Sequence, residues 1–228
     1  MTADRTGTQR LTVGITGHRP NRLAIGASKT ARRLRFVLSA LSSGIPPDVK
    51  RSAVSALAEG ADRIFATKAL AGDFKVHALL PFSVDDYITT FGDPSTTTEF
   101  HELLAAAAEV RTLDGTLSDS AAAYEAVGVA TVATSDLIIA VWDGAAAAGR
   151  GGTPEVVAHA VNLKMPVIWI NAAEDQPPKL LLRSGETGSR TLPFATLARH
   201  APPLSRARIA ALARAACAQD RHHTRRVG

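Results

Sequence analysis

Short apolar segments alternate with longer amphipathic stretches along the first 171 residues. The segments that predict strands span 11–16, 51–57, 75–80, 109–113, 137–142 and 166–170. The stretches that predict helices span about 29–41, 59–71, 84–91, 97–108, 119–134 and 153–162. The later strands are continuously apolar, which indicates burial on both faces of a parallel sheet. The pattern predicts a Rossmann-like, doubly wound α/β domain: a three-layer sandwich with a mostly parallel sheet of about six strands.

The chain divides into three parts on this reading. Residues 1–10 form a polar N-terminus that we expect to be flexible, and residues 11–171 form the α/β domain. Residues 172–228 break the alternation with proline pairs at 177–178 and 202–203. One helix is predicted there, near 205–218, with Ser205 as its cap. This tail either packs on the domain, acts as a linker or binds an acidic partner.

Composition narrows the class of protein. Hydrophobic residues make up 46% of the 228 residues, which excludes disorder for the bulk of the chain. The single cysteine, Cys217, excludes a disulfide scaffold and suits a reducing compartment. No apolar run approaches the length of about 20 residues that a bilayer helix needs. The first ten residues lack the apolar stretch of a secretory signal. These features predict a soluble cytoplasmic protein with no membrane association.

Positive charge is unevenly distributed. The formal net charge is +5, and residues 172–228 hold ten Lys or Arg against four Asp or Glu. The stretch from Arg5 to Pro47 holds eight basic residues and no acidic one. A basic surface around the first loop and helix would attract a phosphate-bearing ligand. The basic tail leaves nucleic-acid binding open as a weaker alternative, because its one aromatic residue, Phe194, provides little for stacking on single strands.

Ligands of doubly wound sheets bind beyond the carboxyl ends of the strands. In the first loop Gly17 permits close backbone approach, and Arg19 offers a planar fork for phosphate. The second loop leads into a helix whose N-terminal amides can hold an anion. In the third loop an aromatic ring could stack on a base. The candidate binding residues from these three loops are Gly17, His18, Arg19, Glu59, Gly60, Pro81 and Phe82.

The strongest candidate follows the fifth strand. Two consecutive glycines, a hydroxyl and a guanidinium stand directly before a helix, which is what a phosphate site on a helix N-terminus requires. Glu155, in the first turn of that helix, either complements the helix dipole or acts on a glycosidic carbon. The candidate binding residues here are Trp142, Asp143, Gly144, Arg150, Gly151, Gly152 and Thr153.

Other catalytic machinery is absent from the sequence. There is no Walker A motif, and the segment Gly14–Gly17 lacks the third glycine of a dinucleotide fingerprint. The seven histidines are scattered, and Cys217 has no recognisable catalytic context. The sequence therefore predicts neither a metal nor a resident cofactor.

Five motifs in order resemble the SLOG superfamily of Rossmann-like proteins. They lie at 14–19, 56–62, 80–82, 123–128 and 139–155, within the part of the chain that the resemblance covers, 11–171. The superfamily includes the DNA-processing Smf proteins, the LOG phosphoribohydrolases and the ligand-sensing domain of melastatin-type channels. The resemblance implies binding of nucleotides or of derivatives such as ADP-ribose. It also implies that Gly17 and Arg19 line the site and that Gly151, Gly152 and Thr153 hold phosphate.

The resemblance leaves enzyme and sensor open. Glu155 matches the glutamate that ends the Gly-rich motif of LOG enzymes, but the spacing from Thr153 differs, and Tyr124-Glu125 stands where those enzymes place an arginine. This favours a ligand-sensing domain that binds a nucleotide signal and reports to an effector domain or protein partner, with homodimerisation as a further expectation. The alternative is an N-glycosidase or phosphoribohydrolase that uses Glu155 as its catalytic acid.

Overall fold

The computed structural model describes residues 9–146, 150–182 and 201–225. Within this part of the chain one sheet has seven strands in the order β4-β3-β2-β1-β5-β6-β7. The first six strands are parallel, and β7 runs antiparallel beside β6. The strands are β1 Arg10–Gly17, β2 Lys50–Ser55, β3 Lys75–Leu80, β4 Glu109–Thr112, β5 Leu137–Trp142, β6 Val167–Asn171 and β7 Lys179–Leu181. The predicted α/β architecture is therefore confirmed.

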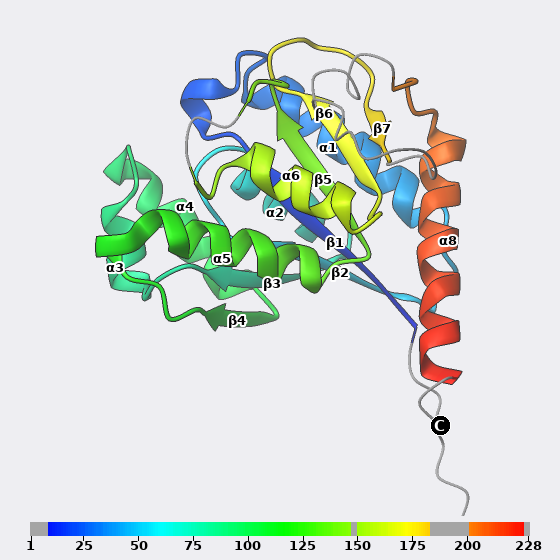
Figure 1. The fold of residues 1–228 in the computed structure, drawn as a ribbon, viewed down its shortest axis with the longest axis horizontal. Coiled ribbons are helices and arrows are strands. Elements are labelled where there is room, and N and C mark those ends of the chain that lie inside the picture. The colour runs from blue at the N-terminus through cyan, green and yellow to red at the C-terminus, as the bar shows by residue number, and fades with distance from the viewer. Residues whose placement is uncertain (1–8, 147–149, 183–200, 226–228) are drawn as a thin grey trace, which may run out of the picture.

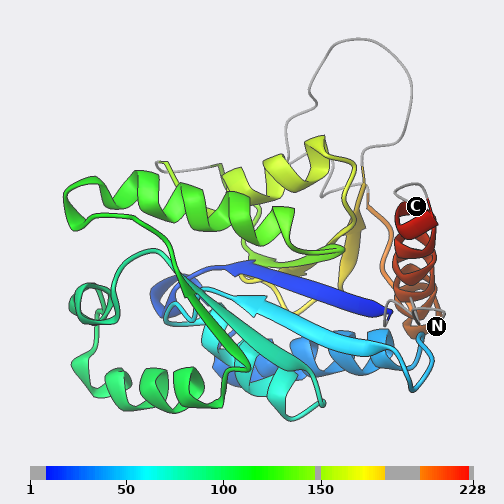
Figure 2. The same ribbon diagram turned by 90° about the horizontal axis from the view of Figure 1, so that it is seen from below.

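Helices cover both faces of the sheet (Figures 1 and 2). One layer contains α5 and α6, and the layer opposite contains α1 and α2, with α8 packed beside α1. The helices are α1 Ala27–Ser42, α2 Ala61–Leu70, α3 Val84–Thr89, α4 Thr97–Ala106, α5 Ser120–Ala133, α6 Thr153–Asn162 and α8 Arg206–Arg225. In the described part of the chain, no helix has the length and apolar content needed to span a membrane.

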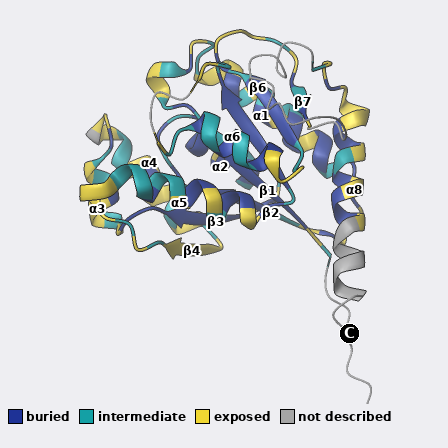
Figure 3. Ribbon diagram, viewed as in Figure 1, coloured by how far each residue is buried: buried dark blue, intermediate teal, exposed yellow. Residues whose placement is uncertain are grey.

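Strand β5 shows why the central strands are continuously apolar. Ile139 and Val141 pack into the core on the α1 and α2 side, whereas Ile138, Ala140 and Trp142 pack under α6. All six residues of β5 are buried, as the dark blue central strands in Figure 3 show. Burial on both faces removes the alternation of a half-exposed strand.

The second predicted strand ends earlier than the sequence suggests. We expected residues 51–57, but β2 stops at Ser55, and Leu57 adopts a left-handed backbone with φ of 55°. The Ser55 hydroxyl accepts a hydrogen bond from the Leu57 amide and donates to the Asp62 carbonyl. These bonds turn the chain towards α2 just after the sheet.

The C-terminal helix belongs to the folded domain. Ile209, Ala213 and Cys217 of α8 are buried against the core. Gly44 lies so close that a Cβ there would be 2.2 Å from the Ala210 carbonyl oxygen. The Arg206 guanidinium donates to the carbonyl and hydroxyl of Ser39 in α1. The described helix of the tail therefore packs on the domain, which is one of the three alternatives that the sequence left open. Residues 1–8, which we expected to be flexible, lie outside the described part of the chain.

Candidate functional site

A cleft opens where the strand order reverses. The chain passes from β1 outwards to β4 and then returns to place β5 on the other side of β1. Ligands of such sheets bind at this reversal, beyond the carboxyl ends of the strands. The cleft there has a volume of about 420 Å³. Its lining includes Gly17, His18, Arg19, Arg22, Asp62, Tyr87, Tyr124, Arg150, Gly151, Gly152 and Thr153.

The loop after β1 is fixed against the start of α2. The Ala61 amide donates to the His18 carbonyl over 3.1 Å. Gly60 has a φ of 94°, and a Cβ at this position would lie 2.6 Å from the same carbonyl. Only a glycine allows this approach. Gly60 thus shapes the cleft without lining it, although we had predicted it as a binding residue.

Arg19 is held in the cleft by three neighbours. Its guanidinium donates to the Glu59 carboxylate at 3.1 Å, to the Thr90 carbonyl at 3.2 Å and to the Tyr124 hydroxyl at 3.2 Å. The Arg19 side chain is 37% exposed, whereas Glu59 is 6% exposed. The guanidinium is therefore oriented by one buried carboxylate and two half-buried partners, while part of the Arg19 side chain faces solvent.

Glu59 positions other groups and does not line the cleft. Besides Arg19 it accepts hydrogen bonds from the amides of Gly92 and Asp93 and from the Thr96 hydroxyl. Burial alone would raise the pKa of Glu59, but these hydrogen bonds and the Arg19 charge hold the pKa below its ordinary value. The carboxylate therefore stays charged and connects Arg19 to the 92–96 loop.

A charged cluster joins the ends of β1 and β5. The His18 Nε2 atom lies 3.0 Å from Asp143 Oδ1, and an Arg22 nitrogen lies 2.6 Å from Asp143 Oδ2. Burial would raise the pKa of Asp143, but hydrogen bonds from the Ala145 amide, His18 and Arg22 lower it to about 2. Asp143 thus fixes His18 and Arg22, both of which line the cleft.

The glycine loop before α6 has the geometry expected of an anion site. Gly152 is the N-cap of α6 and provides no side chain to cap the helix. Gly151 has a φ of 77°, and a Cβ there would lie 2.7 Å from the Ala121 carbonyl oxygen. The backbone therefore packs directly on α5, and the start of α6 faces the cleft with Thr153. Arg150 also lines the cleft, and its guanidinium forms an ion pair with the Glu125 carboxylate, with 2.7 Å between the nitrogen and oxygen atoms.

Glu155 lies outside the cleft. Its carboxylate accepts a hydrogen bond from the Gly151 amide. With Val129 and His159 it lines a separate groove between α5 and α6, of about 330 Å³. Glu155 thus holds the glycine loop, and it does not line the cleft in which a catalytic role would place the ligand.

Two aromatic residues that we predicted as ligand contacts, Trp142 and Phe82, do not line the cleft. Trp142 is fully buried under α6, its ring centroid 6.1 Å from that of Trp169, and its indole donates to the Ala145 carbonyl. Phe82 is fully buried and packs edge-on against Tyr124. Pro81 and Gly144 likewise do not line the cleft.

Sequence reasoning missed two buried residues at the cleft, Asp62 and Tyr87. Asp62 lies in the first turn of α2, and burial raises its pKa to about 7 against the lowering effect of the Ala56 and Ala58 amides and of Arg19. The Tyr87 hydroxyl is buried and has no hydrogen-bond partner among the described residues. Asp62 belongs to the motif at residues 56–62, but its burial depends on tertiary packing and could not be read from that motif. Among the described residues no group of three potential ligands could hold a metal ion.

Comparison with solved structures finds similarity in fold at low identity. DNA processing protein A (DprA) from Streptococcus pneumoniae aligns with 15% identity and a TM-score of 0.49, covering 70% of this chain and 50% of that one. TM1055, a structural genomics target, aligns with 12% identity and a TM-score of 0.44, covering 69% and 72%. The chain thus spans about half the length of the DNA processing protein.

No family model and no curated protein matches the chain. Neither likeness identifies a ligand. The site described above rests on the geometry of this chain.

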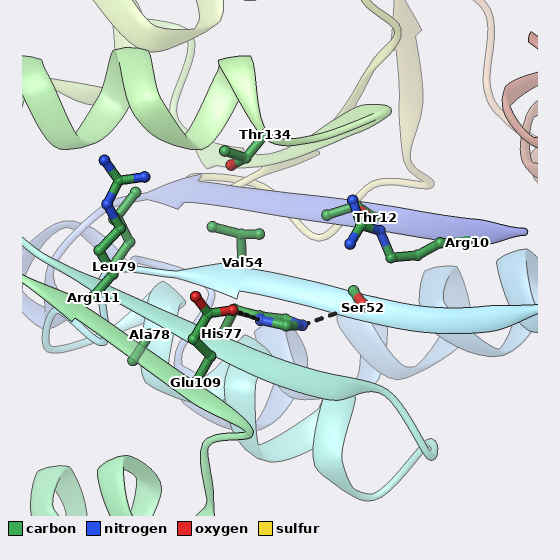
Figure 4. A pocket seen from close by; sticks show the side chains of 10 residues that line it. All are labelled: Arg10, Thr12, Ser52, Val54, His77, Ala78, Leu79, Glu109, Arg111 and Thr134. Atoms are coloured by element: carbon green, nitrogen blue, oxygen red, sulfur yellow. Dashed lines mark hydrogen bonds and ion pairs between the residues drawn. The ribbon is translucent and has the colours of Figure 1, made fainter. Parts of the chain in front are cut away.

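A third cavity lies on the sheet face beyond the C-terminal end of α5 (Figure 4). This sheet-face groove has a volume of about 170 Å³ and includes Arg10, Thr12 and Arg111 in its lining. His77 lies between two neighbours, with Nδ1 3.0 Å from the Glu109 carboxylate and Nε2 3.3 Å from the Ser52 hydroxyl. Ser52 belongs to β2, an interior strand whose backbone amides bond to the adjacent strands. None of these amides is therefore available to stabilise an oxyanion next to the Ser52 hydroxyl.

Proposed function

We propose that this chain binds a nucleotide or nucleotide-derived ligand in the cleft between β1 and β5, as a ligand-sensing domain. The phosphate would lie between the Arg19 guanidinium and the glycine loop before α6. The observation that carries the proposal is the convergence of Arg19, Arg22 and Arg150 with Gly151, Gly152 and Thr153 on one cleft at the strand reversal.

Electrostatics support a phosphate at this place. The N-terminus of α6 carries partial positive charge, which favours an anion. Guanidinium groups bind phosphate with paired, charge-assisted hydrogen bonds. Arg19 is already oriented by Glu59 and Tyr124, so less conformational entropy is lost when a ligand binds.

The hydrolase alternative receives less support from the same geometry. It requires a carboxyl group beside the glycosidic carbon, and Glu155 lines the groove between α5 and α6 and not the cleft. The proposal is therefore binding without turnover.

The experiment is calorimetric titration of the full chain with AMP, ADP-ribose and adenosine, followed by chromatography of each recovered mixture. We expect AMP and ADP-ribose to bind saturably and to be recovered intact. Adenosine, which lacks the phosphate, should bind at least about 10-fold more weakly, since hydrogen bonds to charged groups contribute about 1.5–3 kcal/mol. Equal affinity for adenosine and AMP would contradict the phosphate assignment, and free adenine in the recovered mixture would make the chain an enzyme.

A further inference from the structure

The unpartnered hydroxyl of Tyr87 is the least explained polar atom at the cleft. Tyr87 is fully buried, and its ring packs in an aromatic cluster with Phe82, Phe91 and Phe100. A buried hydroxyl without a hydrogen bond destabilises a fold, so native proteins seldom retain one. The aromatic cluster would be packed as well by phenylalanine. Packing of the aromatic cluster therefore does not explain why this residue carries a hydroxyl.

The hydroxyl lies among groups that line the cleft. Burial raises the pKa of Tyr87, and the charge of Asp62 raises it further, so the two groups are electrostatic neighbours. Tyr124 and Arg19 also influence this hydroxyl. Asp62, Tyr124 and Arg19 all line the cleft together with Tyr87. Tyr87, whose hydroxyl has no partner, thus belongs to the lining of the proposed ligand site.

We propose that Asp62 and Tyr87 form a subsite for the hydroxyl groups of the sugar that carries the phosphate. This inference rests on the proposed function. A sugar hydroxyl donates to the Asp62 carboxyl and accepts from the Tyr87 hydroxyl through a single oxygen. The Tyr87 hydroxyl thereby gains the partner that it lacks in the described part of the chain.

The charged groups around Asp62 and Tyr87 disfavour a second phosphate or a cationic group at this subsite. A second phosphate would meet the buried Asp62 carboxyl without water to screen the repulsion. A cationic group would be repelled by Arg19, which lines the same cleft and acts electrostatically on Asp62. A neutral hydroxyl avoids both penalties.

The position of Arg19 places this subsite next to the phosphate. Arg19 acts electrostatically on Asp62 and Tyr87, and it is also the principal phosphate ligand in the proposed function. In a nucleotide the group bonded directly to the phosphate is the sugar, and the base lies one step further away. The subsite beside the phosphate is therefore assigned to the sugar.

The test compares two small phosphates as probes. Ribose 5-phosphate carries three sugar hydroxyls, and tetrahydrofurfuryl phosphate has the same ring and phosphate without them. Both are titrated calorimetrically into the wild-type chain and into Tyr87→Phe, Asp62→Asn and Tyr124→Phe. Tyr124→Phe is the matched control, because it removes a hydroxyl of the same cleft that already has partners. Circular dichroism of each variant verifies the fold.

The wild type should bind ribose 5-phosphate about 5-fold or more tightly than tetrahydrofurfuryl phosphate. In Tyr87→Phe and Asp62→Asn this ratio should fall towards one, with the affinity for tetrahydrofurfuryl phosphate unchanged. Tyr124→Phe should change both affinities together and leave the ratio intact.

Two results would overturn the inference. Equal affinity of the wild type for both probes, or a ratio that survives in Tyr87→Phe, would refute the subsite while leaving the phosphate site in place. Failure of both probes to bind would refute the proposed function itself, and the subsite with it.

Discussion

The cleft and the sheet-face groove both include polar side chains in their lining, but they differ in how those polar atoms are satisfied. In the groove, His77 bonds to Ser52 on one side and to Glu109 on the other. In the cleft, the Tyr87 hydroxyl has no partner and Asp62 is buried with a raised pKa. Among the described side chains, none of the buried atoms that lack a partner belongs to the groove lining.

This difference separates a structural polar surface from a binding site. Side chains that satisfy one another stabilise the fold and gain little from a ligand. Side chains with unmet hydrogen-bonding capacity destabilise the free protein, and a ligand recovers that loss. The shape of the two cavities does not show this contrast, whereas their hydrogen bonds do. The following substitutions test it.

The largest expected effect concerns Asp62 and pH. Burial raises the folded-state pKa of Asp62 from 3.8 to about 7, so the folded chain binds a proton that the unfolded chain releases. The stability of the wild type should therefore decrease as pH rises from about 4 to 8. Relative to Asp62→Asn the decrease should be on the order of 4 kcal/mol, at 1.36 kcal/mol per pKa unit.

The measurement is chemical denaturation of the wild type and Asp62→Asn across this pH range. The control is Glu109→Gln, which changes the exposed acid of the groove and should alter stability by less than about 1 kcal/mol at any pH. A pH-independent difference between wild type and Asp62→Asn would mean that Asp62 is not buried as described.

The next effect concerns Asp143 in acid. Its pKa lies at about 2 in the folded chain and near 3.8 when unfolded, so it stabilises the fold above about pH 4, and this stabilisation is lost as pH falls through 2. Asp143→Asn should be less stable than the wild type by about 2 kcal/mol at pH 6. Urea denaturation at pH 6, 4 and 2 should show this difference decreasing. A difference that stays constant across the series would contradict the charged cluster with His18 and Arg22.

The smallest effect has opposite signs in the two cavities. Tyr87→Phe removes an unsatisfied hydroxyl and should raise the free energy of unfolding of the apo protein by about 1 kcal/mol. Ser52→Ala removes a hydroxyl bonded to His77 and should lower it by about 1 kcal/mol. Denaturation of both variants at pH 7 checks the signs. A loss of stability in Tyr87→Phe would remove the contrast between the cavities.

Sequence patterns predicted most of the fold because the positions of apolar residues follow which residues of each strand and helix are buried. Strands β3 and β5 and helix α6 occur at the predicted bounds. The Asp119 side chain caps α5 by accepting a hydrogen bond from the Ala122 amide. Strand β7 was missed because three residues after a proline pair carry too little pattern. It forms only because β6 offers an edge for pairing.

The site was partly predictable for a topological reason. Loops after parallel strands meet at one edge, so Arg19 and the glycine loop could be assigned to one cleft from the order of elements alone. Which side a residue faces could not be predicted where both faces are buried. For this reason we predicted Trp142 as a ligand contact, whereas its side chain packs under α6. Asp62 and Tyr87 could not be found, because their burial depends on elements far apart in the sequence.

The most direct test of the account compares one arginine from each cavity. AMP is titrated calorimetrically into the wild type, Arg19→Ala and Arg111→Ala, at matched salt and with folding verified. The account predicts that Arg19→Ala weakens AMP binding by about 10- to 150-fold, since it removes charge-assisted hydrogen bonds, while Arg111→Ala leaves the affinity unchanged. Equal affinities for the wild type and Arg19→Ala, or a comparable loss in Arg111→Ala, would contradict the assignment of the cleft as the ligand site.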